Sequence, residues 1–127
     1  MKIYMHWDME GCCGLHHKDQ AWYWYPHVPE STKEEGLRLL MADINNAVTA
    51  ALDAGADHVY ICDTHHGGGN IRIPEMLQDP RVTYHGTSTR TENGRLRWMP
   101  DLDETIDAFM LPGHHAKRYT YLTPDLG

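Results

Sequence analysis

Three short runs of possible metal ligands occur in the sequence, and each follows an apolar segment. The runs are Asp8-Met9-Glu10, Asp63-Thr64-His65-His66 and His114-His115. Carboxylate oxygens and imidazole nitrogens together suit zinc and similar first-row metals. The carboxyl ends of parallel strands lie along one edge of a sheet, so ligands far apart in the sequence can meet there. The pattern therefore predicts a metal site at that edge.

Asp8 and Glu10 are separated by a single residue. Alternate residues of a strand face the same way, so both carboxylates at a strand end can point at one cation or at a pair. An exposed polar strand end is the other interpretation. Gly11 and Gly14 favour the metal site, because glycine permits the sharp turn and close backbone approach that such a site needs.

The second run contains two adjacent histidines and leads into three glycines at 67–69. Asp63 is either a ligand itself or the group that orients His65 from behind. The glycines invite a phosphate-binding interpretation, but the run has neither the Gly-Lys-Ser/Thr of a P-loop nor the Gly-x-Gly-x-x-Gly of a dinucleotide site. Metal binding is the chemistry that this segment favours.

Three cysteines offer the main rival chemistry, a thiol nucleophile paired with a histidine. Cys12, Cys13 and Cys62 are odd in number and two are neighbours, so a disulfide framework is not expected. A small apolar filler is the commoner role of a reduced cysteine. The remaining histidines are expected to be exposed or hydrogen-bonded; they include His16, His17, His27, His58 and His85.

Hydrophobic patterning predicts the strands that must position these ligands. Residues 3–8 alternate in polarity as a strand with unlike faces does, while 59–62 and 108–111 are short apolar runs. Such runs could also be buried helix segments, but the glycines and prolines beside them favour strands.

The strongest helix signal lies between the first two predicted strands. Ser31 or Thr32 is the expected N-cap, with Glu34 or Glu35 completing a capping box, and Gly55 is expected to end the helix. Apolar residues fall at helical spacing on one face; they are Leu37, Leu40, Met41, Ile44, Ala47, Val48 and Ala51. Strand, helix and strand in this order predict a parallel crossover.

Weaker signals complete the pattern. They predict a short helix from Pro74, a brief strand at 81–84, and a loop or hairpin over 86–106 with a weak helical turn near Leu102.

We therefore expect an α/β fold, a mainly parallel sheet with flanking helices and with ligands at the carboxyl edge of the strands. Residues 1–127 contain no repeat or linker and are expected to form a single α/β domain.

Composition limits the possible partners. A formal charge of −7, with no basic stripe, argues against binding nucleic acid. No apolar stretch is long enough to span a bilayer, and the start lacks the basic region and apolar run of a secretory signal. We expect a cytoplasmic protein that binds neither nucleic acid nor membrane.

Four motifs together resemble a known family. They are Met5-His6-Trp7-Asp8-Met9-Glu10-Gly11, the helical run Glu35-Gly36-Leu37-Arg38-Leu39-Leu40-Met41, then Cys62-Asp63-Thr64-His65, and Gly113-His114-His115-Ala116-Lys117. In this order they are similar to successive motifs of the DppA-type D-aminopeptidases, a family of zinc metallopeptidases. The resemblance covers essentially the whole chain, and four motifs in register are more specific than any one alone.

The resemblance implies a metal-dependent aminopeptidase that acts on short peptides with a free amino terminus, D-amino acid peptides among them. It implies that Asp8 and Glu10 ligate a two-zinc centre, with one carboxylate able to bridge, and that His65 and His115 are further zinc ligands. Other divalent metals remain alternatives to zinc. His114 replaces the aromatic residue usual in its motif and is not assigned as a ligand. A homo-oligomer is also implied.

The chain departs from the family pattern after its last motif. Thr123-Pro124 matches a family loop, but no residue matches the family's catalytic histidine or its last glutamate ligand. We therefore assign no catalytic residue and expect a fragment that corresponds to the N-terminal half of a longer metallopeptidase. The alternative is a non-catalytic module that binds metal or a partner. The aromatic run at 22–25 fits either a contact surface for a partner or a loop over the site.

Overall fold

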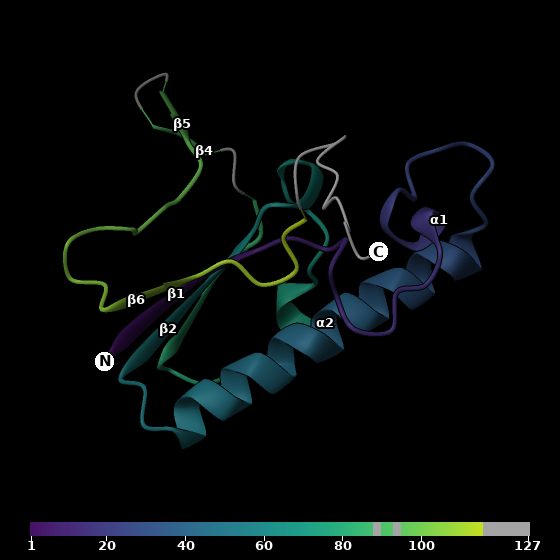
Figure 1. The fold of residues 1–127 in the computed structure, drawn as a ribbon. Coiled ribbons are helices and arrows are strands. Elements are labelled where there is room, and N and C mark those ends of the chain that lie inside the picture. Colours follow the sequence, from purple (N-terminus) through teal and green to yellow (C-terminus); the bar gives the residue numbers. More distant parts are fainter. Residues whose placement is uncertain (88–89, 93–94, 116–127) are drawn as a thin grey trace, which may run out of the picture.

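A four-stranded parallel sheet forms the centre of the molecule (Figure 1). The computed structural model describes residues 1–87, 90–92 and 95–115, so the predicted motif residues at 116–117 and 123–124 lie outside the described part. The strand order is β3-β2-β1-β6, and every neighbouring pair is parallel. The strands are β1 (Lys2–Trp7), β2 (His58–Asp63), β3 (Val82–His85) and β6 (Ala108–Met110). The α/β prediction is confirmed.

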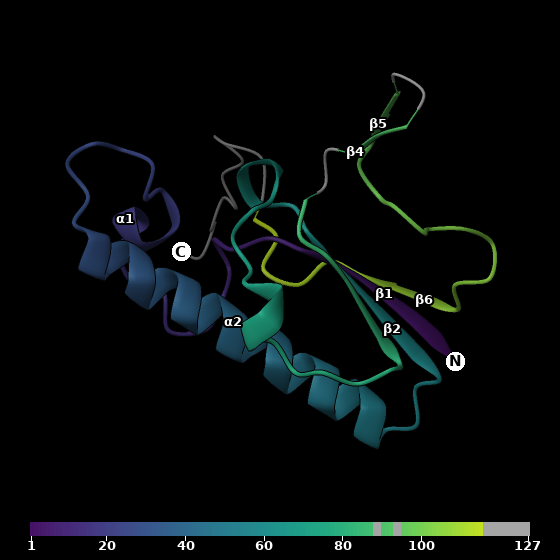
Figure 2. The same ribbon diagram turned by 180° about the vertical axis from the view of Figure 1, so that it is seen from behind.

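The long helix α2 (Glu30–Asp53) connects β1 to β2 and runs along one face of the sheet in both views (Figures 1 and 2). The apolar stripe of α2 packs against the strands. This contact buries a hydrophobic core between one long helix and the sheet. The stripe buries Leu37, Leu40, Met41, Ile44, Val48 and Ala51 against Ile3, Met5, Trp7, Val59 and Ile61. The parallel crossover and its buried face are as predicted.

The start of α2 differs from the prediction. The helix begins at Glu30 with Pro29 as its N-cap, and no side chain caps it. Pro29 has an extended backbone, with φ −62° and ψ 144°, and its carbonyl accepts from the amides of Thr32 and Lys33 at 3.0 and 3.2 Å. Proline near the first turn loses no helical hydrogen bond, so it displaced Ser31 and Thr32 from the capping position.

The end of α2 agrees with the prediction. Gly55 has φ +90°, its amide donates to the Leu52 carbonyl, and the Ala56 amide donates to Ala51, both at 3.0 Å. This pair of bonds is a Schellman motif, which favours glycine at the left-handed position.

Strand β1 does not have the unlike faces that its alternating polarity predicted, because both sides are buried. On the face away from α2, Tyr4 donates to the Pro100 carbonyl at 2.8 Å and stacks on Phe109 with ring centroids 5.7 Å apart. The edge strand β6 contrasts with it, since Phe109 and Met110 are exposed by 43% and 45%.

The shorter elements connect the strands. Residues 86–106 contain an antiparallel pair, β4 (Arg90–Glu92) with β5 (Arg95–Arg97), which agrees with the hairpin of the predicted loop or hairpin. Near Leu102 there is a turn, with its amide 3.4 Å from the Met99 carbonyl, and not a helical segment. The short helices are α1 (Lys18–Ala21), which was not predicted, η1 (His65–Gly67) and η2 (Ile73–Glu75).

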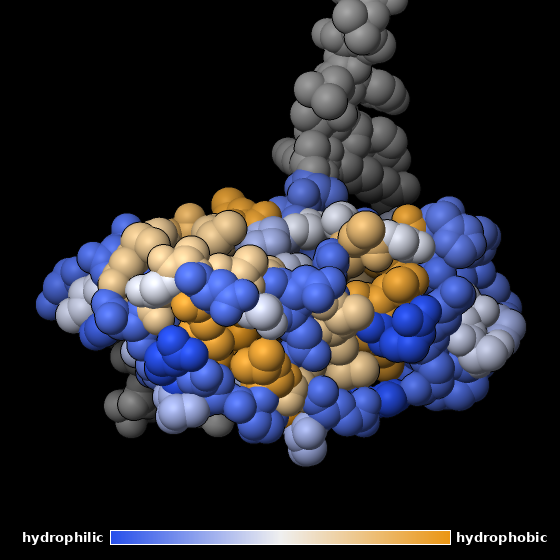
Figure 3. Space-filling view, turned by 90° about the horizontal axis from the view of Figure 1, so that it is seen from below, coloured by the Kyte–Doolittle hydropathy of each residue, from blue (hydrophilic) through white to orange (hydrophobic). Residues whose placement is uncertain are grey.

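No helix in the described part is long and apolar enough to cross a membrane. The face seen in Figure 3 has hydrophobic patches set among hydrophilic side chains.

We expect Gly36→Ala to destabilise the fold. A methyl group at Gly36 would overlap the backbone carbonyl oxygen of Gln20, where α1 packs on α2. At an open helix position the change would stabilise by up to about 1 kcal/mol. Here it should lower the free energy of unfolding by about 1–3 kcal/mol in urea titrations. Asn46→Ala, at an exposed position of α2, is the control and should not destabilise. Equal stability of Gly36→Ala and wild type would contradict this packing.

Candidate metal centre

The segment after β1 lies against the segment after β6. The Asp8 amide donates to the Pro112 carbonyl at 3.0 Å, and the Gly11 amide donates to the Gly113 carbonyl at 2.8 Å. Gly113 has φ +70°, and a Cβ there would overlap the Asp8 carbonyl oxygen. Glycine is therefore required for this approach. The contact brings the chain after Gly113 beside the two acidic residues.

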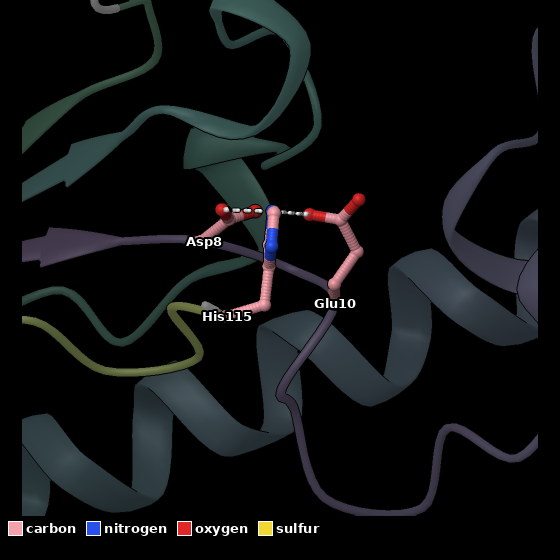
Figure 4. Close-up of side chains that lie close together, drawn as sticks. All are labelled: Asp8, Glu10 and His115. Carbon is pink, nitrogen blue, oxygen red and sulfur yellow. Dashed lines mark ion pairs between the residues drawn. The ribbon is translucent and has the colours of Figure 1, made fainter. Parts of the chain in front are cut away.

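His115 completes a cluster with the two carboxylates (Figure 4). Its Nε2 lies 3.2 Å from Glu10 Oε2 and 3.8 Å from Asp8 Oδ2. One potential ligand atom from each of the three residues lies within 4.8 Å of the others. Such spacing suits donors around a common cation.

His65 joins the same cluster from the end of β2. Its Nδ1 lies 2.9 Å from Asp8 Oδ1 and 3.3 Å from Glu10 Oε2. Its Nε2 lies 2.8 Å from the Ala21 carbonyl oxygen, an acceptor that holds the proton on Nε2. Metal-binding histidines are commonly oriented by such a second hydrogen bond. The structure thus brings together all four residues proposed from the sequence.

The adjacent histidines lie outside the cluster. His66 has a left-handed backbone with φ 51°, and its ring stacks on Trp24 with centroids 4.1 Å apart. His114 Nε2 is 2.9 Å from the His6 carbonyl oxygen and 3.2 Å from His6 Nδ1. The side chains of each adjacent pair therefore face different surroundings.

The carboxylate of Asp63 has a structural role. Among the described residues, its hydrogen bonds go to Asn70 and Ile71 and not to His65. It is buried and accepts from the Asn70 amide at 2.7 Å, the Asn70 side chain at 2.8 Å and the Ile71 amide at 3.2 Å. Burial raises its pKa, and these hydrogen bonds oppose the rise. The Asn70 side chain also donates to the His65 carbonyl at 2.7 Å. Asp63 thus supports the backbone beneath the site.

The buried cysteines do not favour the rival chemistry. Burial raises the pKa of Cys12 to about 12 and also raises the pKa of Cys62. A thiol that stays protonated is a poor nucleophile. The Trp7 indole donates to Cys12 Sγ at 3.1 Å, so this thiol is part of the packed core.

Two contacts of the site were not predicted from the sequence. The Trp22 indole N–H donates to Glu10 Oε1 at 2.7 Å, and the Ala21 carbonyl binds His65. The aromatic run at 22–25 was a signal for the first, because a loop over the site was one of its two interpretations. No residue-type signal marks a backbone carbonyl such as that of Ala21.

Comparison with known proteins gives the family. A family model described as D-aminopeptidase matches residues 1–122. The chain belongs to the D-aminopeptidase family. No curated protein matches it.

One solved structure shares the fold of this family member. It is the Zn-dependent D-aminopeptidase DppA from Bacillus subtilis, described as a self-compartmentalizing protease. The similarity covers 94% of this chain and 40% of that one, with a TM-score of 0.72 and 22% sequence identity. Likeness at this level of identity shows the parallel α/β fold and no more. The chain spans 40% of the length of its solved neighbour.

The protonation of the cluster can be derived from its contacts. Burial lowers the pKa of His65, but the hydrogen bonds to Asp8 and Ala21 and the charge of Glu10 outweigh it, so the pKa is raised. Burial raises the pKa of Asp8, but hydrogen bonds involving His65, Glu10 and the Met9 amide outweigh it, so the pKa is lowered. Both shifts favour an imidazolium beside a carboxylate at this position.

The residues present fit a zinc ion. Two carboxylates and two imidazoles are a donor set that zinc accepts, and the hydrogen bond to Ala21 leaves Nδ1 of His65 directed at the carboxylates. The direction of the His65 pKa shift fits as well, because surroundings that favour a proton on this ring also favour a cation beside it. Metal binding should therefore release that proton.

We expect zinc affinity to fall in acid, and His65 sets where the loss begins. An ordinary histidine has a pKa of about 6.5. Because the pKa of His65 is raised, zinc begins to compete with a proton on this ring at a pH above that value. Below that raised pKa, affinity should drop by at least about tenfold per pH unit. The lowered pKa of Asp8 delays its own protonation to much lower pH. Zinc titration by calorimetry from pH 8 to 5.5, in two buffers of different ionisation enthalpy, measures affinity and proton release. An affinity independent of pH would contradict this scheme.

We expect the histidine pairs to respond unequally to substitution. His65→Ala and His115→Ala should each weaken zinc binding by more than about a hundredfold, since each removes a donor that faces the carboxylates. His66→Ala and His114→Ala are the matched controls and should have much smaller effects. Zinc titration of the four variants against a competing chelator gives the ranking. The reverse ranking within either pair would show that the other histidine is the ligand.

Proposed function

We propose that the chain is a metal-dependent, two-zinc aminopeptidase-like hydrolase that removes the first residue of short peptides, D-amino acid peptides among them. The convergence of Asp8, Glu10, His65 and His115 at the carboxyl edge of the sheet carries the proposal. Family membership supports a peptidase. The solved neighbour is described as a Zn-dependent D-aminopeptidase, which supports zinc and the D-specific substrate.

The arrangement of Asp8 supports two ions in place of one. Asp8 Oδ1 lies 2.9 Å from His65 Nδ1, and Asp8 Oδ2 lies 3.8 Å from His115 Nε2. Each oxygen of this carboxylate is therefore near a different imidazole. Asp8 would therefore be a residue able to hold two cations. Glu10 then adds a second carboxylate, with Oε1 held by Trp22 and Oε2 near both histidines.

Zinc at this position would acidify a water molecule and polarise the scissile carbonyl of a peptide. The chain's own contribution is to hold the donors. Ala21 fixes the orientation of His65, Trp22 fixes that of Glu10, and the backbone contact at Gly113 places His115. We assign no residue to proton transfer to the leaving amine.

A homo-oligomer and a cytoplasmic location are further parts of the proposal. The solved neighbour is described as self-compartmentalizing, which supports assembly of subunits.

The second candidate function is a metal-binding or partner-binding module without catalysis. The exposed aromatic side chains of Trp22, Trp24 and Tyr25 are the observation that favours this second candidate, because they fit a contact surface for a partner.

Peptide hydrolysis by the purified chain tests the proposal. With zinc present, dipeptides with a free amino terminus should be cleaved, their N-acetylated forms should not, and D- and L-series should differ in rate. Zinc at about 100 times its dissociation constant should stabilise the wild type by about 2.7 kcal/mol, measured by thermal unfolding. Glu10→Gln should lose most of this gain and all turnover.

The control is Glu104→Gln, an exposed acid outside the cluster, which should behave as wild type. Equal zinc stabilisation of Glu10→Gln and wild type would reject Glu10 as a ligand and the two-zinc site with it. Zinc binding at Asp8 and Glu10 without hydrolysis of any dipeptide would reject the peptidase and favour the metal-binding module.

A further inference from the structure

A cavity opens beside the metal cluster, and the cluster forms part of its wall. Its volume is about 630 Å³, within the range of about 300–1,000 Å³ that small-molecule sites occupy. It is lined by Glu10, Trp22, Trp24, Tyr25 and His115. Three of these five residues are aromatic side chains of one loop, and the other two belong to the cluster.

Contacts with the site hold this aromatic wall in place. The Trp22 indole donates to Glu10 at 2.7 Å. Trp24 stacks on His66, with rings 11° from parallel, and its centroid lies 5.6 Å from that of His65. The Tyr23 hydroxyl donates to the Asn70 side chain, which ties the loop to the segment after β2. A wall fixed by such contacts needs little further ordering when it binds a ligand.

The wall also leaves apolar surface open to water. Large aromatic side chains are usually buried in a protein core. Here three of them remain partly exposed: Trp22 by 38%, Trp24 by 39% and Tyr25 by 45%. Covering aromatic faces with another apolar group removes that surface from water. A ligand with a flat apolar group therefore gains most from this cavity.

We propose that the cavity is a subsite for an aromatic side chain of the substrate, next to the peptide bond that the metal centre cleaves. The inference rests on the proposed function and adds to it a preference for substrate. A methyl side chain is too small to cover the three rings.

A cationic side chain is the closest competitor, because aromatic faces also attract ammonium groups. Glu10 is the only carboxylate among the described residues that line the cavity. Its Oε1 accepts from Trp22, and its Oε2 faces His65 and His115. Both oxygens thus already have partners, so the charge partner that a lysine side chain needs is engaged.

Binding of amino acid amides tests the preference without relying on turnover. Phenylalaninamide and alaninamide share the amine and the amide and differ only in the phenyl ring, so the ratio of their dissociation constants reports the subsite. Both enantiomers of each are titrated into the full chain, with and without zinc, by calorimetry. For at least one enantiomer, phenylalaninamide should bind at least about tenfold more tightly than alaninamide.

Variants of the wall locate the effect. Trp24→Ala should reduce the ratio to near one, and Trp24→Phe should restore most of it by replacing the aromatic face. Tyr25→Leu removes another ring of the wall, one that contacts Trp24 but does not itself stack on His66, and should also reduce the ratio. Trp98→Ala removes an exposed tryptophan that does not line the cavity and should keep the wild-type ratio.

A wild-type ratio of one, or a ratio that survives both Trp24→Ala and Tyr25→Leu, overturns the subsite. Lysinamide binding as tightly as phenylalaninamide overturns it in favour of a cation site. Zinc titration of the same samples separates the two proposals. Zinc binding with a ratio of one rejects the subsite and leaves the metal centre, whereas a ratio that depends on Trp24 without zinc binding rejects the metal centre and leaves the subsite.

Discussion

The site depends on two backbone hydrogen bonds that continue the pairing of β1 with β6 beyond the sheet. The strands themselves pair over only three residues, from Ile3 to Met5. The bonds from Asp8 to Pro112 and from Gly11 to Gly113 extend this contact into the loops, and the missing Cβ of Gly113 permits it. Together with the contact of the His114 ring with the His6 carbonyl, these bonds place His115 beside the carboxylates, so the third strand end contributes to the cluster.

His65 reduces the electrostatic repulsion between the carboxylates of the cluster. Two neighbouring carboxylates alone would repel and raise each other's pKa, and partial burial would add to the effect. The structure shows the opposite for Asp8, whose pKa is lowered, because the His65 ring donates to it. A buried imidazolium is itself costly, but here it has a carboxylate on one nitrogen and the Ala21 carbonyl on the other. Both ring nitrogens of His65 therefore face oxygen acceptors, which favours the protonated ring next to Asp8.

Much of this could be predicted from the sequence, because apolar runs and glycines act locally. The runs at 59–62 and 108–111 gave strands whose ends bring His65 and His115 to one edge, and Gly55 ended the helix through its left-handed backbone. The start of α2 could not be predicted from capping side chains, since Pro29 satisfied the geometry without one. The Ala21 carbonyl was also beyond prediction. It belongs to α1, whose four residues are too short for a periodic signal, and its role arises only from the tertiary packing of Gly36 against Gln20.

Glu10 connects the metal cluster to the aromatic cavity. One of its oxygens accepts from Trp22 in the cavity wall, and the other lies between two imidazoles of the cluster. A carboxylate held at one oxygen loses rotational freedom, so its second oxygen stays directed at the imidazoles. The loop over the site and the imidazoles of the cluster therefore share one side chain, Glu10, which contacts both.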